Sequence, residues 1–210
     1  MGSGVEDERN RDAITTKVTK AYLTYVIMPL WIVPGFLDWA YHRRAKIEDT
    51  SGTHESMIHS MMMASIGVPA LFGLLCEVNA GLLATFAGAF AVHEALVIWD
   101  VGYANGRREV SPGEQHCHSF LEVLPFMSLS YMLCTHWDQA LALTGAGPDR
   151  PRWSLEPKRE PLPPLFVAGL LGAITLCIGL PYAEELVRCF RTDRTLAPHK
   201  KPPKGKAPAT

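Results

Sequence analysis

Five long apolar blocks constrain the fold of this chain more than any other feature of its sequence. They cover residues 22–42, 54–76, 79–103, 114–143 and 165–190. Each is near the roughly 20 residues that an α-helix needs to cross the hydrocarbon core of a bilayer. Backbone groups left unpaired in lipid are too costly, so segments of this kind cross as helices. We therefore predict an all-α fold: an integral membrane helical bundle with about five transmembrane helices.

Polar segments at the two ends divide the chain into three parts. Residues 1–20 form a polar N-terminal lead, residues 21–190 the transmembrane helical domain and residues 191–210 a basic tail. The tail has six Lys or Arg against one Asp, together with repeated prolines. This composition predicts disorder. The formal net charge of the whole chain is -1, which gives no reason to expect nucleic-acid binding.

The distribution of basic residues predicts the orientation in the membrane. Short cytoplasmic loops carry an excess of Lys and Arg. If the basic tail is cytoplasmic, five crossings put twelve of the 20 Lys and Arg on the cytoplasmic side and eight on the other. The sequence therefore predicts a multi-pass protein with a cytoplasmic C-terminus and an N-terminus on the opposite side.

Acid and imidazole side chains recur at helical spacing near the predicted cytoplasmic ends of the helices. Asp38 precedes His42 by four residues, and Glu55 precedes His59 by four. Residues four apart on a helix share one face, so each pair can hold one metal ion or polar group. Ionisable groups at this depth are costly without a partner, which makes them candidates for a functional site.

The next two helices continue the pattern. His93 and Asp100 are seven residues apart, and Glu114, His118 and Glu122 follow each other at intervals of four. Both spacings return to the same helical face. The sequence thus predicts one metal site with ligands from four successive helices: Asp38, His42, Glu55, His59, His93, Asp100, Glu114, His118 and Glu122.

Several of these residues also have a purely structural interpretation. His42, beside two arginines, is equally suited to the membrane interface, and Glu114 to the first turn of a helix. His54 and His116 suit a loop or a place outside the ligand set. A further group of acids is expected to pair with Arg43, Arg44 or Arg188 rather than with a metal. This group is Glu94, Glu184 and Glu185.

The residue types indicate which metal the site would hold. Mixed imidazole and carboxylate ligands suit iron, manganese or zinc, whereas copper(I) and structural zinc prefer thiolates. Helical bundles build carboxylate-bridged dimetal centres by projecting Glu and His inward from several helices. Nine candidate ligands exceed what one ion needs. We therefore predict two transition-metal ions as cofactors, with iron favoured over zinc or manganese.

Residues 38–122 resemble, in plan, the integral-membrane di-iron enzymes of the fatty acid desaturase and hydroxylase group. Those enzymes also place histidine clusters at the cytoplasmic ends of a helical bundle. The likeness is one of plan: His54 and His59 are five apart, and His116 and His118 are two apart. The HxxxH and HxxHH clusters of that group are therefore absent. The resemblance implies a di-iron centre and an oxidation reaction.

The predicted function is a membrane oxidoreductase that uses dioxygen to hydroxylate, desaturate or otherwise oxidise a lipid-like or hydrophobic substrate. A separate cytoplasmic electron-donor protein would supply electrons, because the sequence contains no flavin or nicotinamide fingerprint. Two alternatives use the same residues. One is a transporter of metal ions or protons, and the other is a b-type haem protein with ligands such as His59 and His118.

Overall fold

The structure, a computed structural model, describes residues 14–15, 17–18 and 21–196. Most of the predicted polar lead and the last 14 residues of the predicted tail lie outside the described residues. Most of the described chain is helical and no strand occurs in it, so the predicted all-α membrane bundle is confirmed. Its elements, in chain order, are η1 (Leu23–Ile27), α2 (Met28–Ala45), η2 (Ile47–Asp49), α3 (Gly52–Leu75), α4 (Ala80–Ala104), α5 (Pro112–Thr135), α6 (Trp137–Leu143), α7 (Pro164–Ile174), η3 (Thr175–Gly179) and α8 (Leu180–Leu196).

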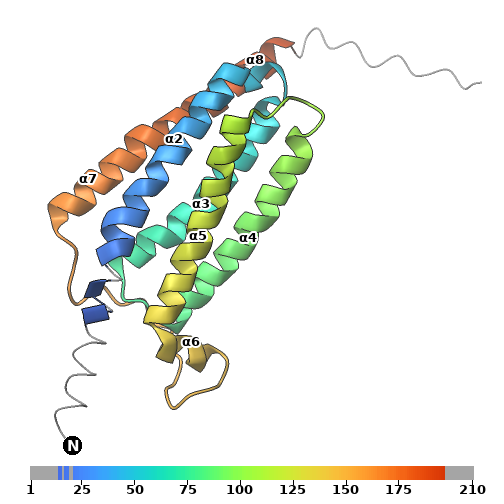
Figure 1. Cartoon of the computed structure of the whole chain (residues 1–210). Coiled ribbons are helices and arrows are strands. Elements are labelled where there is room, and N and C mark those ends of the chain that lie inside the picture. The colour runs from blue at the N-terminus through green and yellow to red at the C-terminus, as the bar shows by residue number, and fades with distance from the viewer. Residues whose placement is uncertain (1–13, 16, 19–20, 197–210) are drawn as a thin grey trace, which may run out of the picture.

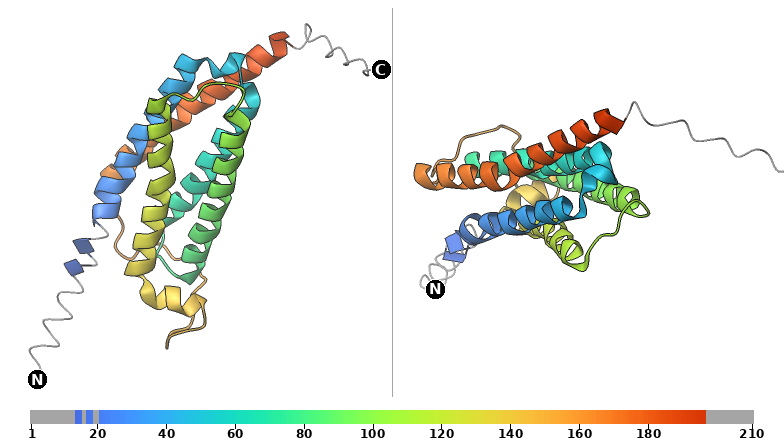
Figure 2. Two further views of the ribbon diagram at one scale, coloured as in Figure 1. Left: turned by 45° about the vertical axis from the view of Figure 1, so that its right-hand side comes forward. Right: turned by 90° about the horizontal axis from the view of Figure 1, so that it is seen from above.

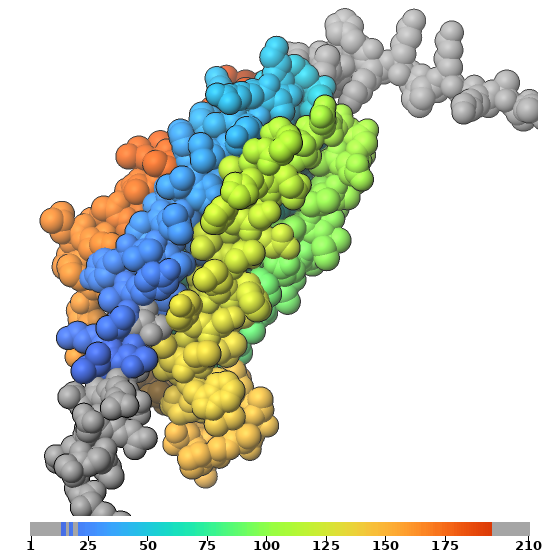
Figure 3. Space-filling model, viewed as in Figure 1, coloured from blue at the N-terminus to red at the C-terminus, as the bar shows by residue number. Residues whose placement is uncertain are grey.

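Five helical segments are long and apolar enough to cross a membrane. They are Leu23–Ala45, Gly52–Leu75, Ala80–Ala104, Pro112–Thr135 and Pro164–Arg194. They run alternately up and down, so η1 and the C-terminal end of α8 lie at opposite ends of the bundle (Figures 1 and 2). Helix α3 packs against both α4 and α8, and α2 packs against α5. Figure 3 shows α2 and α5 side by side on one face, with α6 projecting at the end.

The outer surface of the bundle is apolar, and its interior is polar at one end. Large aliphatic side chains such as Leu165, Leu176 and Ile98 are 65–86% exposed. Seven buried side chains, by contrast, carry carboxylates or imidazoles that converge near the end where α2 finishes and α3 begins: Asp38, His42, Glu55, His59, Asp100, Glu114 and Glu185. Exposed aliphatic side chains suit a lipid environment, whereas buried charge must be compensated within the protein. This end is called the cluster end below.

Local sequence explains where α4 and α5 begin. The Asn79 side chain accepts a hydrogen bond from the Leu82 N–H, and the Ser111 hydroxyl accepts one from the Glu114 N–H. Both are ordinary N-cap contacts that satisfy free N–H groups in the first helical turn. Pro112 occupies the first turn of α5, where its missing N–H costs nothing. The cap at Ser111 fixes the start of α5, and therefore the depth at which Glu114 enters the bundle.

Two predicted boundaries differ from the structure. The fourth block was expected to run to residue 143, but α5 ends at Thr135 and the separate helix α6 follows. His136 breaks the helix with a φ of -128° and a ψ of 45°. The Gln139 side chain then accepts hydrogen bonds from the backbone N–H groups of Ala80 and Arg152, which tie α6 to the start of α4. Helix α8 continues to Leu196, beyond the predicted start of the tail at residue 191.

Helix α8 is anchored to the cluster end by charged contacts. Arg188 forms ion pairs with Glu48 in η2 and with Glu184 on its own helix, and Glu184 also accepts a 2.6 Å hydrogen bond from Arg43. These contacts hold α8 beside α2 and the short connection between α2 and α3. They also fix the rotation of α8 about its axis, so that Glu185 faces the interior of the bundle.

Candidate metal centre

The acid–histidine cluster comprises eight residues from five helices. It contains Asp38 and His42 from α2, Glu55 and His59 from α3, Asp100 from α4, Glu114 and His118 from α5, and Glu185 from α8. The three acid–histidine pairs spaced four residues apart all lie within it. All but His118 are buried, and the His118 side chain is 20% exposed. The structure thus brings together seven of the nine residues predicted as ligands.

The first half of the cluster joins α2 and α5. Asp38, His42, Glu114 and His118 each offer one ligand atom, and these four atoms lie within 4.8 Å of one another. His42 Nε2 is 3.4 Å from both Asp38 Oδ2 and Glu114 Oε1, and His118 Nε2 is 2.9 Å from Asp38 Oδ1. Two carboxylates and two imidazoles at such distances form a complete ligand set for one transition-metal ion.

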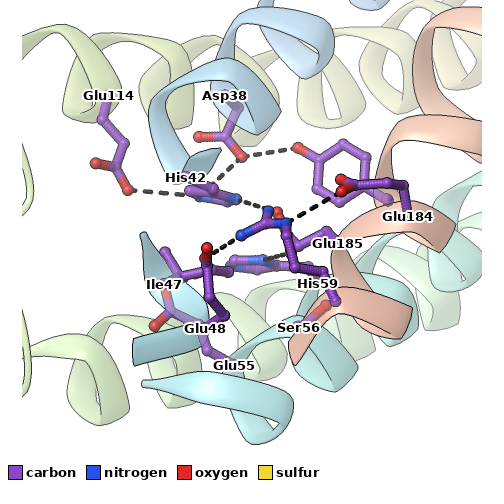
Figure 4. A network of polar contacts seen from close by, with 12 residues as sticks. Asp38, His42, Ile47, Glu48, Glu55, Ser56, His59, Glu114, Glu184 and Glu185 are labelled. Carbon is purple, nitrogen blue, oxygen red and sulfur yellow. Dashed lines mark hydrogen bonds and ion pairs between the residues drawn. The ribbon is translucent and has the colours of Figure 1, made fainter. Parts of the chain in front are cut away.

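The second half joins α3 and α4 and lies directly beside the first half. His59 Nε2 is 3.3 Å from Asp100 Oδ1 and 3.8 Å from Glu55 Oε1. The His59 ring stacks on the His42 ring, with centroids 4.4 Å apart and planes within 10° of parallel. Figure 4 shows His59 beneath His42, and Asp38 and Glu114 directed toward His42. The two halves are therefore close enough to act as one centre.

Glu185 contacts both stacked histidines on the side away from the other carboxylates. Its Oε2 is 3.0 Å from His42 Nδ1, and its Oε1 is 3.4 Å from His59 Nδ1. An ionised carboxylate only accepts hydrogen bonds, so both rings must present Nδ1–H to Glu185. Each neutral ring then has its Nε2 lone pair free. Metal-ligating histidines are commonly oriented by a carboxylate on the second ring nitrogen in this way.

The remaining ligand atoms converge without forming hydrogen bonds. Four buried side-chain atoms of the cluster have no hydrogen-bond partner among the described residues: Asp38 Oδ1, His42 Nε2, His59 Nε2 and Asp100 Oδ1. Yet they lie 2.9–3.4 Å from other ligand atoms. Metal–ligand bonds of about 2.1 Å at right angles place neighbouring ligand atoms about 3 Å apart. Such close contacts require a positive charge among these atoms, supplied either by protonated imidazoles or by a bound cation.

Arg108 connects the two halves from the loop between α4 and α5. Its Nη2 lies 2.5 Å from Glu55 Oε1 and 2.6 Å from Glu114 Oε1, and its side chain is 3% exposed. Burial disfavours the charged guanidinium, but the hydrogen bonds to Glu55 and Glu114 outweigh burial and raise the pKa of Arg108 above its ordinary value. Arg108 therefore remains a cation that holds these two carboxylates together.

The cluster carries an excess of negative charge. Its five carboxylates, opposed by the Arg108 guanidinium, leave four negative charges if the imidazoles are neutral. Uncompensated charge inside a membrane bundle costs several kcal/mol per group. Two divalent cations would balance these four charges. The electrostatics therefore favour the binding of cations in the cluster.

Tyr182 of α8 completes the surroundings of Asp38. Its buried hydroxyl has a single hydrogen to donate and lies 2.8 Å from Asp38 Oδ2 and 3.1 Å from the Gly35 carbonyl oxygen, so Asp38 is the nearer acceptor. Its ring packs edge-on against both His42 and His59, with centroids 6.2 Å away in each case. Tyr182 thus orients one ligand and closes the cluster on the side facing the interior of the bundle.

Two of the predicted ligands lie outside the cluster. His93 is buried, but it is seven residues before Asp100, which places it about 10 Å along the helix axis. Its Nδ1 instead lies 3.4 Å from the Ser65 hydroxyl. Glu122 is exposed on the outer face of α5, where it lines a small pocket with Glu94. Sharing a helical face with a ligand did not bring either residue to the centre.

Sequence reasoning missed three members of the site. Glu185 was expected to pair with arginines, whereas it is the adjacent Glu184 that does so. Tyr182 and Arg108 were not considered as site residues. The sequence did contain a signal for Glu185 and Tyr182. They are three residues apart in an apolar span, so they share one helical face.

The donor set limits the metals that fit. Imidazole nitrogen and carboxylate oxygen are suitable ligands for iron, zinc and manganese, and no thiolate joins either half of the cluster within the described residues. Comparisons with protein-family models, with curated proteins and with solved structures find no match for this chain. Its chemistry must therefore be inferred from the geometry of the cluster.

Proposed function

We propose that the chain is a membrane-embedded dimetal oxidoreductase, with two iron ions in the acid–histidine cluster, that oxidises a lipid-like or hydrophobic substrate with dioxygen. The observation that carries the proposal is the orientation of His42 and His59. Glu185 holds both rings by Nδ1, which turns two Nε2 lone pairs toward buried carboxylates. An Nε2 that faces a carboxylate at these distances needs a positive charge between the two atoms, either a proton on the ring or a metal ion. We assign this charge to two divalent ions, because they also balance the four negative charges of the cluster.

The number and type of ligands favour iron and redox chemistry over a purely structural metal. A structural zinc site is closed by four ligands, usually rich in cysteine. Here seven side chains, four carboxylates and three imidazoles, are available to two ions, and Glu185 orients two of the imidazoles, as in the dimetal centres of helical bundles. Iron bound in this way supplies dioxygen chemistry, while the protein supplies orientation and a dry cavity.

The reaction defines what else the protein needs. Hydroxylation inserts one oxygen atom of O₂ into a C–H bond and reduces the other to water, which consumes two electrons and two protons. Desaturation removes two hydrogen atoms and has the same requirement for electrons. We infer that a one-electron donor protein docks at the cluster end. Basic residues beside the cluster support a cytoplasmic location for this end: Arg43, Arg44, Lys46 and Arg107.

The geometry gives less support to transport and to haem binding. A transport site is expected near mid-membrane, with access from both sides. Here Asp38 is seven residues from the end of α2, and Glu55 is in the first turn of α3. A haem iron needs no carboxylates, yet five surround the histidines, and the His42 ring fills the space against His59.

Replacing Glu185 with Gln is expected to weaken metal binding by about 10–100-fold, the usual effect of losing a partner that orients a ligand. The amide can accept a hydrogen bond from one Nδ1–H, but its NH₂ group opposes the other, so His42 and His59 cannot both keep their orientation. Competition with a chelator of known affinity measures the change. Glu184→Gln, which alters the exposed neighbour paired with Arg43 and Arg188, is the matched control. Equal affinities for both variants would contradict the role of Glu185.

The proposed reaction is tested with the full chain in liposomes, loaded with Fe(II) and supplied with a reductant and ¹⁸O₂. Mass spectrometry of the extracted lipids is expected to detect ¹⁸O insertion or loss of two hydrogens, dependent on both O₂ and reductant. The His59→Ala variant should give no product, and His54→Ala, on the same helix but outside the cluster, should match the wild type. Accumulation of ⁵⁵Fe in the lumen without any lipid oxidation would favour transport instead.

A further inference from the structure

The half of the bundle away from the cluster contains a large, mainly apolar cavity that is partly open to the surface. Its volume is about 1040 Å³, at the upper end of the roughly 300–1,000 Å³ of small-molecule sites. Helices α2, α3, α4 and α5, together with η1 and residues 158–163, frame it, and Trp31, Phe86 and Phe90 are among its lining residues. Its lining runs from Ile66 to Leu74 on α3 and from Pro125 to Thr135 on α5, an axial extent of about 12–15 Å. This extent suits one linear chain aligned with the helices.

The outer rim of the cavity is polar, unlike its body. The charged side chains at the rim are Lys17, Glu77, Lys158, Arg159 and Glu160, three basic and two acidic. Lys158 Nζ donates to the Cys76 carbonyl oxygen, and Glu77 Oε1 accepts from the Arg159 backbone N–H, which ties the loop after α6 to the end of α3. An apolar body with a charged rim matches an amphiphile whose head stays at the rim.

The inner end of the cavity points toward the acid–histidine cluster. Trp31 is seven residues before Asp38 on α2, Ile66 is seven after His59 on α3, and Pro125 on α5 follows the ligand His118 by the same interval. Seven residues rise about 10 Å along a helix. On three helices, therefore, the inner wall lies two turns from a cluster residue. From Leu74 at the rim to His59, the axial distance is about 22 Å.

We propose that this cavity binds a single-chain amphiphile with an anionic head at the rim and its tail directed toward the acid–histidine cluster. The excess of one basic side chain at the rim selects the anionic head, and the aromatic and aliphatic wall accommodates the chain. The proposal deepens and rests on the proposed function, because it makes this ligand the substrate. Because the lining ends about 10 Å from the cluster, the tail must extend past the inner end to be oxidised, and oxidation would then occur toward the end of the chain.

The test uses long-chain carboxylates that carry a photoreactive diazirine either beside the head or near the tail. The full chain, in lipid nanodiscs, is irradiated with each probe, and mass spectrometry locates the labelled peptides. The tail diazirine is expected to label the inner end, at Trp31, Ile66 or Phe90, and the head diazirine to label residues near Lys158 and Leu162. The reverse polarity, or labelling confined to lipid-facing residues such as Leu176 and Ile98, would overturn the proposal.

Two substitutions on α3 separate the cavity from the lipid surface. Ala70 lines the cavity, and Ala70→Phe should reduce inner-end labelling by about tenfold because the ring occupies the volume of the chain. Ala64 is exposed on the outer face of the same helix, so Ala64→Phe should leave the labelling unchanged. A diazirine-bearing alkylamine of the same length tests whether the rim selects an anionic head, and it should label the cavity less than the carboxylate does. Equal labelling by the amine and the carboxylate would contradict the anionic assignment.

Labelling on metal-loaded and metal-stripped protein distinguishes this proposal from the proposed function. The cavity lies about 10 Å from the cluster along α2, α3 and α5 and farther along α4, so the labelling pattern should persist without metal. A protein that binds metal but is not labelled at the inner end refutes the cavity proposal alone. A protein that is labelled as expected but binds no metal refutes the oxidoreductase and leaves a lipid-binding site.

Discussion

The His42→Ala variant is expected to lose most of its bound metal, falling from about two transition-metal ions per chain in the wild type to fewer than about one. His42 offers a ligand atom to both halves of the cluster and stacks on His59, so its loss disturbs both sites. Inductively coupled plasma mass spectrometry of the purified proteins measures the change. Circular dichroism and gel filtration check that the variant retains its helical fold.

Two other histidines provide matched controls for this result. His54 is on α3, five residues before His59, and it stacks on Tyr103 rather than joining the cluster. His116 is on α5, two residues before His118, and it contacts Phe120. Replacing either with Ala should leave the metal content at the wild-type level. A wild-type protein that contains no metal after expression in iron-rich medium, and binds none when reconstituted, would refute the proposed centre.

Removing the metal is expected to destabilise the protein, and Asp100→Asn should reverse part of that loss. A ligand at 100 times its dissociation constant stabilises the folded state by about 2.7 kcal/mol. Stripped of cations, the cluster retains four negative charges, which repel one another in a buried site. Asp100→Asn removes one charge at nearly constant volume. The stripped variant should therefore unfold at a higher temperature than the stripped wild type, and the loaded variant at a lower one.

The informative result is that Asp100→Asn should raise the unfolding temperature of the metal-stripped protein and lower that of the metal-loaded protein. Glu122→Gln also removes a carboxylate from a membrane-spanning helix, but on the exposed face of α5, so its effect should be the same with and without metal. If Asp100→Asn instead destabilises the stripped protein, Asp100 is paired with a protonated His59. The cluster would then be a network of ion pairs rather than a metal centre.

The helical fold followed from the sequence because its determinant is local. Every apolar block is long enough to span a bilayer, and lipid permits few alternatives to a helix. The boundary after Thr135 was missed because the signal for it is not apolar periodicity. The chain turns at His136, and α6 is held by contacts of the Gln139 amide with the backbone of distant residues. Such tertiary hydrogen bonds leave no trace in local composition.

The cluster was only partly predictable for a related reason. Spacing shows which residues share a face of one helix, but it does not give their depth relative to residues of other helices. His93 shares a face with Asp100 and still lies two turns away. Glu184 and Glu185 are adjacent, and apolar residues surround both, so hydropathy could not decide which faced inward. The rotation of α8 is set by the pairing of Glu184 and Arg188 with Arg43 and Glu48, which are distant in sequence.

The participation of α8 has a consequence for the biogenesis of the protein. Residues of α2 emerge from the ribosome first and those of α8 last among the helices described, yet Glu185 orients histidines on α2 and α3. During cotranslational insertion, His42 and His59 therefore enter the membrane before the residue that fixes their rings is synthesised. A fully oriented centre can form only after the last span is in place. Complete insertion would thus precede maturation of the cofactor, and a partly inserted chain would lack a finished site.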